Sequence, residues 1–172
     1  MPYYSLLKHY KLVSKVPSWN NITNPKPIIG NNEVNIHWDI PVLSTGSQVL
    51  YAQEQGNKPD VIVNDHENKE IVVLEFSCPW ILNRQKKALE KEEKYQEVRN
   101  KLKRRYVNYK VNQTNVIIDA LGGYSSELQS NLVRLLGKPE TTRVLKMMQK
   151  SVLFGSIRIK NLFKTTVAAS IS

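Results

Sequence analysis

The sequence predicts an α/β fold in a single domain of 172 residues. Short runs of β-branched and aromatic residues, typical of strands, alternate with longer stretches in which apolar residues recur every three or four positions, as in amphipathic helices. The order of these segments is α-β-β-β-α-β-α-α, without an internal repeat. Because one domain takes roughly 150 residues, the length fits a single domain with its own core.

The first third of the chain predicts one helix and one strand. Residues 4–16 have the pattern of a short amphipathic helix that ends at Pro17, and the Asn- and Pro-rich stretch up to residue 32 predicts a loop. Apolar and polar residues then alternate, which predicts a half-buried strand over residues 34–42. Residues 43–57 are polar, with two glycines, and predict a connection.

Two apolar runs follow, at residues 61–63 and 71–76. The second, IVVLEF, is almost continuous in β-branched and aromatic residues, which predicts a central strand buried on both faces and ended by Pro79. Asn83 is suited to cap a long helix that runs to about residue 106. The apolar stripe of this helix has steps of three and four residues and consists of Tyr95, Val98, Leu102, Tyr106 and Tyr109.

The remaining elements complete the α/β pattern. Residues 115–121 (NVIIDAL) predict another strand, closed by Gly122 and Gly123. Residues 125–136 and 139–154 predict two further helices, and the last dozen residues are expected to fray. Four strands are therefore expected in all.

The composition excludes several classes of protein. The single cysteine, Cys78, excludes an internal disulfide framework and a cysteine-based zinc cage. No apolar run approaches the roughly 18 residues of a membrane-spanning helix, and the first eleven residues do not form a secretory signal. We therefore expect an intracellular protein, nuclear or cytoplasmic, without a membrane partner.

The net charge of +10 is concentrated in two segments. Residues 84–110 carry eleven basic and four acidic residues, a net of +7, and residues 138–172 carry seven and one, a net of +6. This distribution suits a polyanionic partner such as a nucleic acid. A solvated surface helix followed by a basic tail is the alternative that charge alone leaves open.

Two carboxylates are expected to face each other across a hairpin. If the two apolar runs pair as antiparallel strands with a turn near residues 67 and 68, paired residue numbers add up to about 135, so that Asp60 lies opposite Glu75, with Cβ atoms about 5 Å apart. The two charges would repel each other, and Glu75 belongs to an apolar strand where burying a charge is costly. Mg²⁺ or Mn²⁺, which prefer oxygen ligands, would remove the repulsion. A slipped register, or a lysine paired with Glu75, is the alternative.

The first turns of the long helix carry lysines where apolar residues would continue the stripe, at Lys87, Lys91 and Lys94. An ammonium group at these positions could reach over the sheet toward Glu75, where it could hold a phosphate or orient a water molecule. Alternatively, the aliphatic stems pack on the edge of the core while the ammonium groups stay in water.

These residues resemble a known motif. Lys58-Pro59-Asp60, fourteen intervening residues, and Glu75 at the end of an apolar strand that precedes a helix resemble the PD-(D/E)XK nuclease motif. The form with Lys or Arg before Pro-Asp is similar to the restriction-like endonuclease domain that follows the reverse transcriptase of non-LTR retrotransposons. The resemblance covers roughly residues 33–160 and includes, in the same order, Trp38-Asp39-Ile40-Pro41, Cys78-Pro79-Trp80, Lys91…Lys94-Tyr95, Ala120-Leu121-Gly122-Gly123 and the segment 149–155.

The resemblance implies a restriction-endonuclease-like fold, a small mixed sheet of about four strands flanked by helices, with Asp60 and Glu75 as ligands of Mg²⁺ or Mn²⁺. The chain departs from the motif at position 77, where the family's lysine is replaced by Ser77. In some relatives this lysine lies on the following helix, which makes Lys91 or Lys94 its replacement. Tyr95, four residues after Lys91, resembles the tyrosine of a Gln-x-x-x-Tyr variant of the motif.

The sequence therefore leads to two hypotheses. The first is a metal-dependent DNA endonuclease of mobile-element origin, and the second is a catalytically inactive nucleic-acid-binding module on the same fold. A homodimer, or a place within a larger polyprotein, stays open. The expected division is an N-terminal helix and loop (1–32), the nuclease-like domain (33–160) and a flexible basic tail (161–172). The residues expected to hold the DNA backbone are Lys58, Lys86, Lys87, Arg99, Lys101, Lys103, Arg104 and Arg105.

Overall fold

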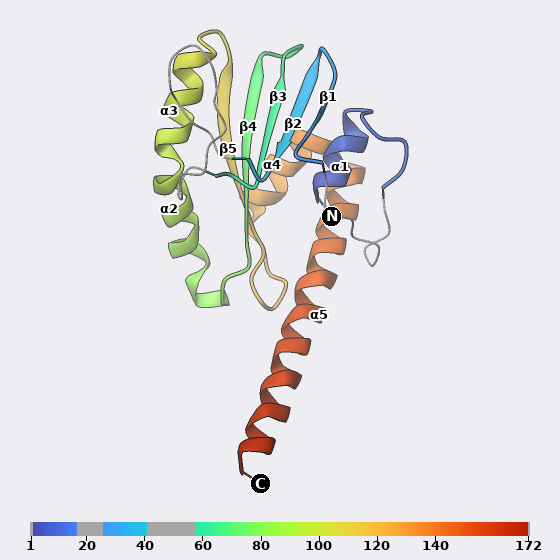
Figure 1. Cartoon of the computed structure of the whole chain (residues 1–172), viewed down its shortest axis with the longest axis vertical. Helices are drawn as coiled ribbons and strands as arrows, with labels where there is room; N and C mark the ends of the chain where they lie inside the picture. The colour runs from blue at the N-terminus through green and yellow to red at the C-terminus, as the bar shows by residue number, and fades with distance from the viewer. Residues whose placement is uncertain (1, 17–25, 41–57, 172) are drawn as a thin grey trace.

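The computed structural model describes residues 2–16, 26–40 and 58–171. They form one five-stranded sheet with helices on both faces, so the predicted α/β class is confirmed (Figure 1). In chain order the elements are α1 (Pro2–His9), β1 (Ile28–Gly30), β2 (Val34–Trp38), β3 (Val61–Asp65), β4 (Glu70–Ser77), the 3₁₀ helix η1 (Ile81–Asn83), α2 (Arg84–Lys94), α3 (Gln96–Arg105), β5 (Lys110–Ile117), α4 (Ser126–Leu136) and α5 (Lys138–Ile171).

The sheet is mixed, with the strand order β1-β2-β3-β4-β5. The first four strands pair in antiparallel fashion, whereas β5 runs parallel to β4. In the β3–β4 hairpin Val61 pairs with Leu74 and Val63 with Val72, which confirms the predicted register. Since parallel neighbours cannot be joined by a tight turn, the chain crosses over the sheet between β4 and β5, and this crossover contains α2 and α3.

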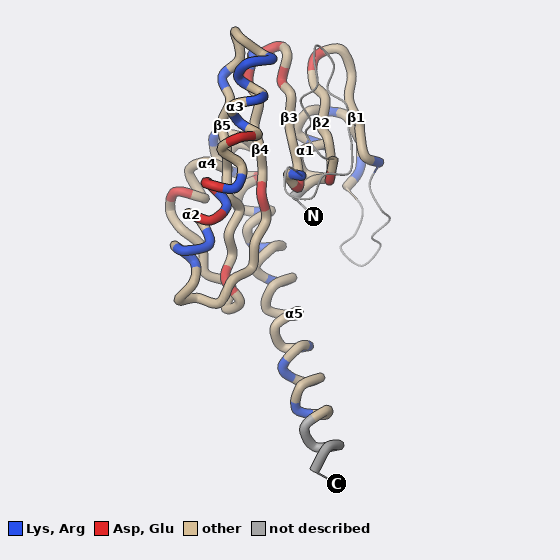
Figure 2. Tube along the Cα trace, turned by 60° about the vertical axis from the view of Figure 1, so that its left-hand side comes forward, with Lys and Arg blue, Asp and Glu red and all other residues tan. Residues whose placement is uncertain are grey.

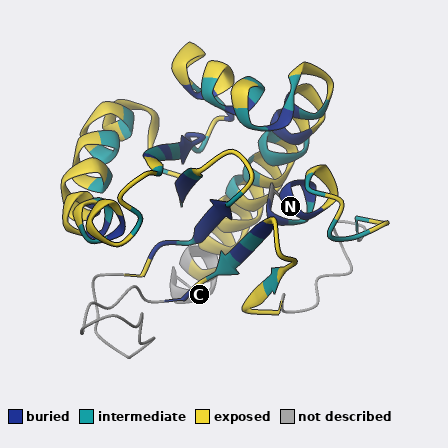
Figure 3. Cartoon of the chain, turned by 90° about the horizontal axis from the view of Figure 1, so that it is seen from above, coloured by how far each residue is buried: buried dark blue, intermediate teal, exposed yellow. Residues whose placement is uncertain are grey.

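Two apolar layers lie on opposite faces of the sheet. Helices α1, α4 and α5 cover one face and pack against residues of β2, β3, β4 and β5 that include Ile36, Val63, Val72 and Val116. On the other face, Tyr95 and the buried residues of α3 pack against the alternate residues of β3, β4 and β5. Figure 3 shows the buried residues gathered along the sheet, with exposed residues on the outer sides of the helices.

Several elements differ from the prediction. The sheet has five strands instead of about four, because β1 lies in the stretch predicted as a loop. Strand β5 starts five residues earlier than predicted, and the single long helix is two helices that meet at Tyr95, whose backbone leaves the helical conformation (φ −98°, ψ 8°). Helix α5 continues to Ile171, through the segment predicted as a flexible tail. The predicted connection at residues 43–57 lies outside the described residues.

Within the described residues, none of the helices combines the length and the apolar character needed to span a membrane.

Candidate functional site

Asp60 and Glu75 lie side by side on one face of the sheet. Alternation along β4 puts Glu75 on the same face as Ile71 and Val73, which pack against α3. Asp60 immediately precedes β3, and its backbone N–H donates a hydrogen bond to Oε1 of Glu75 (3.1 Å). The backbone N–H of Phe76 in turn donates to Oδ2 of Asp60 (2.7 Å). The two carboxylates predicted to face each other are therefore neighbours; the backbone N–H of Asp60 holds that of Glu75, and the backbone N–H of Phe76 holds that of Asp60.

Glu75 is buried and pairs with Lys91. Its side chain is only 1% exposed, within the strand that forms the centre of the core. The Nζ atom of Lys91, on α2, lies 2.5 Å from Oε2 of Glu75, and the lysine side chain is 19% exposed. The positive charge compensates a carboxylate that could not otherwise be buried at low cost. Of the two lysines proposed from the sequence, Lys91 is the one that contacts the acid.

Lys94 lies beside Tyr95. Its Nζ atom lies over the ring of Tyr95, 4.8 Å from the centroid, and Nζ of Lys91 is 5.8 Å from the same centroid. Tyr95 is 1% exposed and donates a hydrogen bond from its hydroxyl to the backbone carbonyl of Lys58 (3.0 Å). Burial, and then the neighbouring Glu75 carboxylate, raise the pKa of Tyr95 above its ordinary value. Tyr95 therefore acts as a neutral donor that connects the α2–α3 junction to the segment before β3.

Two amide side chains of β5, which the sequence analysis missed, attach α2 to the sheet. None of the residues of α2 is buried, so this helix lacks an apolar anchor of its own. Instead, the Gln113 side chain donates a hydrogen bond to the backbone carbonyl of Lys91 (3.1 Å), and the Asn115 side chain donates to that of Ala88 (3.2 Å). These bonds fix the turn of α2 that carries Lys91. The sequence feature that could have indicated this role is the presence of two amide residues, Gln113 and Asn115, two positions apart and therefore on one face of a strand.

The electrostatics of the site favour a cation. Burial raises the pKa of the Asp60 carboxyl, the hydrogen bond from Phe76 lowers it, and the charge of Glu75 raises it again, so that the net direction is upward. Within the described part of the chain, Lys91 is the one ammonium group in contact with this pair of carboxylates, and it contacts Glu75. A bound cation would oppose this rise, because it stabilises the ionised form.

The two carboxylates can supply part of the coordination shell of Mg²⁺ or Mn²⁺. The bond from Phe76 uses Oδ2 of Asp60, and no hydrogen bond or ion pair between described residues engages Oδ1. Although both oxygens of Glu75 accept hydrogen bonds, each has a second lone pair. The described residues contain no group of three or more acidic, histidine or cysteine side chains suited to a metal. A shell of two carboxylates fits Mg²⁺, which usually keeps several waters or substrate oxygens.

Two further residues near the site differ from the simplest motif. Ser77 ends β4 on the same face as Glu75, and its backbone carbonyl accepts a hydrogen bond from the N–H of Ile118. Asp39 pairs with Lys58 at 2.8 Å, and both side chains are about half exposed. The positive charge of Lys58, the first residue of the motif, is thus partly neutralised by Asp39.

The predicted DNA-contacting residues fall into two groups. Basic and acidic residues are interspersed along α2 and α3 (Figure 2). Four of the eight form ion pairs with carboxylates, namely Lys58, Lys87, Arg99 and Lys101. Arg105 lies over the ring of Tyr106, and Lys86, Lys103 and Arg104 are exposed. Exposed ion pairs contribute at most about 1 kcal/mol, so phosphates could replace these acidic partners.

A polar cavity of about 360 Å³ lies beside β5, between residues of α2 and α4. Arg84 and Asn131 are among the residues that line it. Arg84 also donates to Oδ2 of Asp119 (3.3 Å), whose Oδ1 accepts from the backbone N–H groups of Leu121 and Gly123. The buried Asp119 therefore orders the turn after β5, and it belongs to the framework rather than to the site.

Comparisons with protein-family models and with curated proteins find no match for this chain. The geometry around Asp60, Glu75 and Lys91 is therefore the structural indication of function.

Proposed function

We propose that the protein is a metal-dependent DNA endonuclease that hydrolyses phosphodiester bonds. The observation that carries the proposal is the contact of Lys91 with Glu75, at 2.5 Å, beside the adjacent carboxylate of Asp60. The motif resemblance leaves a gap at Ser77, and the ammonium group of Lys91, from the following helix, would act in place of the motif lysine. The resemblance to the nuclease domains of non-LTR retrotransposons favours a mobile-element origin and DNA as the substrate.

Each residue has a chemical task in this proposal. Asp60 and Glu75 would hold Mg²⁺ or Mn²⁺ through their carboxylate oxygens. The bound metal lowers the pKa of a water molecule and offsets negative charge on the phosphate. Lys91 would place a positive charge next to the phosphate that undergoes attack, while Tyr95 fixes the neighbouring backbone through Lys58. The exposed basic residues of α2 and α3 would hold the DNA backbone without reading its sequence.

A second candidate function is a nucleic-acid-binding module that does not cut. Two observations favour it: Ser77 stands at the position of the motif lysine, and both oxygens of Glu75 are already engaged by donors. In this case the pair of Glu75 and Lys91 serves the stability of the core, and the basic residues alone act on DNA. Both candidate functions predict that the protein binds DNA, but only the endonuclease is expected to cleave it.

Cleavage of a supercoiled plasmid separates the two candidates. We expect nicking or linearisation in the presence of Mg²⁺ or Mn²⁺, and none with a chelator. Asp60→Asn and Glu75→Gln should each lower the rate by at least about 100-fold, as expected for loss of a group that positions charge in the reaction. Glu93→Gln, which changes an exposed acid of α2, is the matched control and should cut normally.

DNA binding, measured by fluorescence anisotropy in the presence of a chelator, should be similar in the parent and in both site variants. Cleavage by Asp60→Asn and Glu75→Gln at the parental rate would show that the site is wrongly assigned. Binding by the parent without any cleavage in either metal would establish the non-catalytic module. A DNA substrate also agrees with the proposed nuclear or cytoplasmic location.

A further inference from the structure

The polar cavity beside β5 is a second candidate site, separate from the carboxylate pair. Strand β5 is the last strand of the sheet, and the cavity lies along its outer edge, between α2 on one face of the sheet and α4 on the other. Its volume, about 360 Å³, is in the range of about 300–1,000 Å³ that is typical of sites for small molecules and cofactors. The lining contains four amide side chains, two arginines and two glutamates. The cavity therefore has room for a ligand and polar groups that can orient it.

The charges of the lining disfavour a ligand with many negative charges. Arg99 on α3 pairs with Glu92 (3.5 Å), and both residues line the cavity together with Glu127. Arg84 donates one hydrogen bond to the buried Asp119 (3.3 Å), and a guanidinium group has five N–H donors. A polyphosphate would therefore be repelled by the two glutamates, whereas a single phosphate group could bind to the remaining donors of Arg84.

The amide groups of the lining are suited to a nucleobase. No hydrogen bond between described residues engages the side-chain amides of Gln85 on α2 and Asn131 on α4, which both line the cavity. The Oε1 atom of Gln113 is buried and has no hydrogen-bond partner in the described part of the chain. An amide offers a donor beside an acceptor, the arrangement that pairs with the edge of a base, adenine in particular. Ile117 and Leu128, also in the lining, provide apolar contacts for the faces of a base.

We propose that the cavity binds the base and the phosphate of one unpaired nucleotide, with the base between Gln85 and Asn131 and the phosphate at Arg84. A base that is paired in a duplex cannot enter the cavity, so the nucleotide belongs to a single-stranded or bulged part of a DNA strand, or is a free nucleoside monophosphate. The cavity adjoins the turn of α2 that carries Lys91, because Gln113 bonds to the carbonyl of this lysine. This binding mode rests on the proposed function in that DNA is the strand, and it adds a preference for unpaired DNA.

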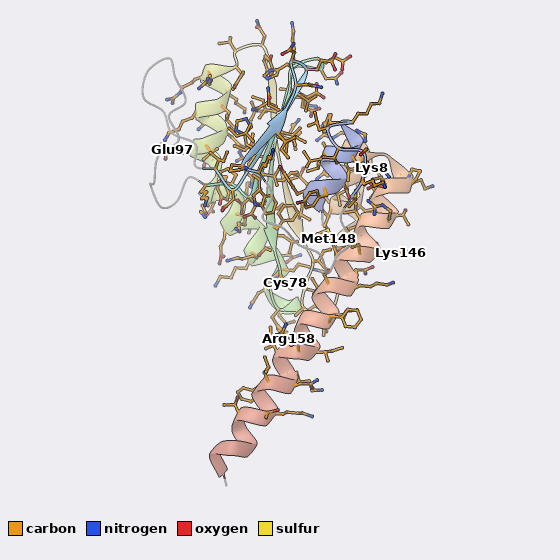
Figure 4. The ribbon with its side chains drawn as sticks, turned by 45° about the vertical axis from the view of Figure 1, so that its right-hand side comes forward. Lys8, Cys78, Glu97, Lys146, Met148 and Arg158 are labelled. Carbon is orange, nitrogen blue, oxygen red and sulfur yellow. The ribbon has the colours of Figure 1, made fainter. Side chains whose placement is uncertain are left out.

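A strand bound in this way would continue over the first of the two basic segments. Arg84 at the start of α2 and Arg99 on α3 line the cavity, and Lys86 and Lys103 are exposed on the same two helices. Within the described residues, no part of α5 lines the cavity. Figure 4 shows Arg158 on the half of α5 that extends past the sheet. The phosphates next to the bound nucleotide would therefore contact α2 and α3, where Lys86 and Lys103 belong to the residues predicted to hold the DNA backbone.

The first experiment compares two DNA duplexes by fluorescence anisotropy in the presence of a chelator, one with a single bulged adenine and one with an abasic bulge at the same place. The parent should bind the adenine bulge about tenfold more tightly, as expected for one amide–base pair. Asn131→Leu, which replaces the amide by an apolar group of similar size, should remove this preference, and Gln85→Leu, at an exposed position, should do the same. Gln129→Leu, which changes an exposed amide of α4 outside the cavity, is the matched control and should keep the preference. Equal binding of both duplexes by the parent would exclude a nucleotide of a strand, and an unchanged preference in both cavity variants would overturn the proposed site.

The second experiment distinguishes a strand from a free nucleotide by NMR of the ¹⁵N-labelled protein. The side-chain amide signals of Gln85 and Asn131 should shift with the adenine-bulge duplex, whereas inorganic phosphate should leave them in place. Shifts with the duplex alone would assign the cavity to a nucleotide of a strand, and shifts with deoxyadenosine monophosphate, without a preference between the duplexes, would assign it to free nucleotides. Signals that move with neither ligand would overturn the proposal.

Both experiments omit divalent metal and measure binding, so they do not depend on nuclease activity. A protein that cleaves plasmid DNA but does not distinguish the two duplexes, and whose amide signals do not shift, would keep the proposed function and exclude the nucleotide site. A protein that binds the bulged adenine but cleaves no DNA would have the nucleotide site without the proposed activity.

Discussion

Replacing Lys91 by methionine is the most direct test of the site. Lys91→Met keeps the length and the aliphatic stem of the side chain but removes the ammonium group. Glu75, only 1% exposed, would then face Asp60 without the cation that now lies 2.5 Å away. The expected results are a less stable fold and a pronounced loss of cleavage.

The loss of stability follows from the burial of the pair. Removing one partner of a buried ion pair costs about 3–5 kcal/mol, whereas a single charge-assisted hydrogen bond contributes about 1.5–3 kcal/mol. Because Lys91 is 19% exposed, water can reach Glu75 after the substitution and relieve part of the penalty. We therefore expect Lys91→Met to lower the free energy of unfolding by about 2–3 kcal/mol, which for a domain of this size is a decrease in melting temperature of about 5–10 °C.

A double-mutant cycle isolates the contact. Urea unfolding of Lys91→Met, Glu75→Gln and the double variant should give a coupling energy of about 1.5 kcal/mol or more, since a neutral glutamine no longer requires the lysine. Lys87→Met, which breaks an exposed pair on the same helix, should leave the midpoint nearly unchanged. A coupling energy close to zero, with Lys91→Met as stable as the parent, would refute the buried contact and the role assigned to Lys91.

Three further predictions concern the framework of the site. Gln113→Leu and Asn115→Leu each remove a hydrogen bond to a carbonyl of α2, so amide hydrogen exchange in residues 84–94 should accelerate, while that of the apolar core stays the same. Burial lowers the pKa of His37 below its ordinary 6.5. Below about pH 6.5 the unfolded chain therefore binds more protons than the folded one, so the free energy of unfolding should decrease as the pH drops. In urea unfolding, His37→Gln should show a weaker decrease of the midpoint over the same pH range. Gly122 has a φ of +85°, so Gly122→Ala should cost about 1–2 kcal/mol in urea unfolding, and a cost near zero would contradict the assigned turn.

Apolar patterns predicted the centre of the fold and failed at its edges. The runs that became β3 and β4 are buried on both faces, so hydrophobicity alone identifies them, and the turn between them sets the register. Strand β1 has only three residues, two of them exposed, and therefore lacks a period that a sequence pattern could reveal. The start of β5 is polar because Asn112 bonds to Glu70 of β4 and Gln113 bonds to α2, instead of packing in a core. The break at Tyr95 leaves the spacing of apolar residues intact, so periodicity cannot detect it.

The site was predictable where backbone geometry determines it. The register of the β3–β4 hairpin alone places Asp60 beside Glu75, independently of the other elements. In the structure the backbone N–H of Asp60 donates a hydrogen bond to the Glu75 carboxylate. The choice between Lys91 and Lys94 was not predictable, since it depends on where α2 stops and how it is attached to β5. Those features come from tertiary contacts of Gln113 and Asn115, which no local pattern specifies.

The topology of the sheet explains why the missing motif lysine can be replaced from a helix. Because β5 is parallel to β4, the chain that leaves β4 just after Glu75 must return along one face of the sheet before it can enter β5. The face is the one on which Glu75 lies, as the packing of Tyr95 and α3 against the same alternate residues shows. A long cation on the side of this crossover that faces the sheet can therefore reach the acid, as Lys91 does. Lys91 is at the turn where the crossover is also bonded to β5 through Gln113, so a lysine at position 77 is not required to bring positive charge to Glu75.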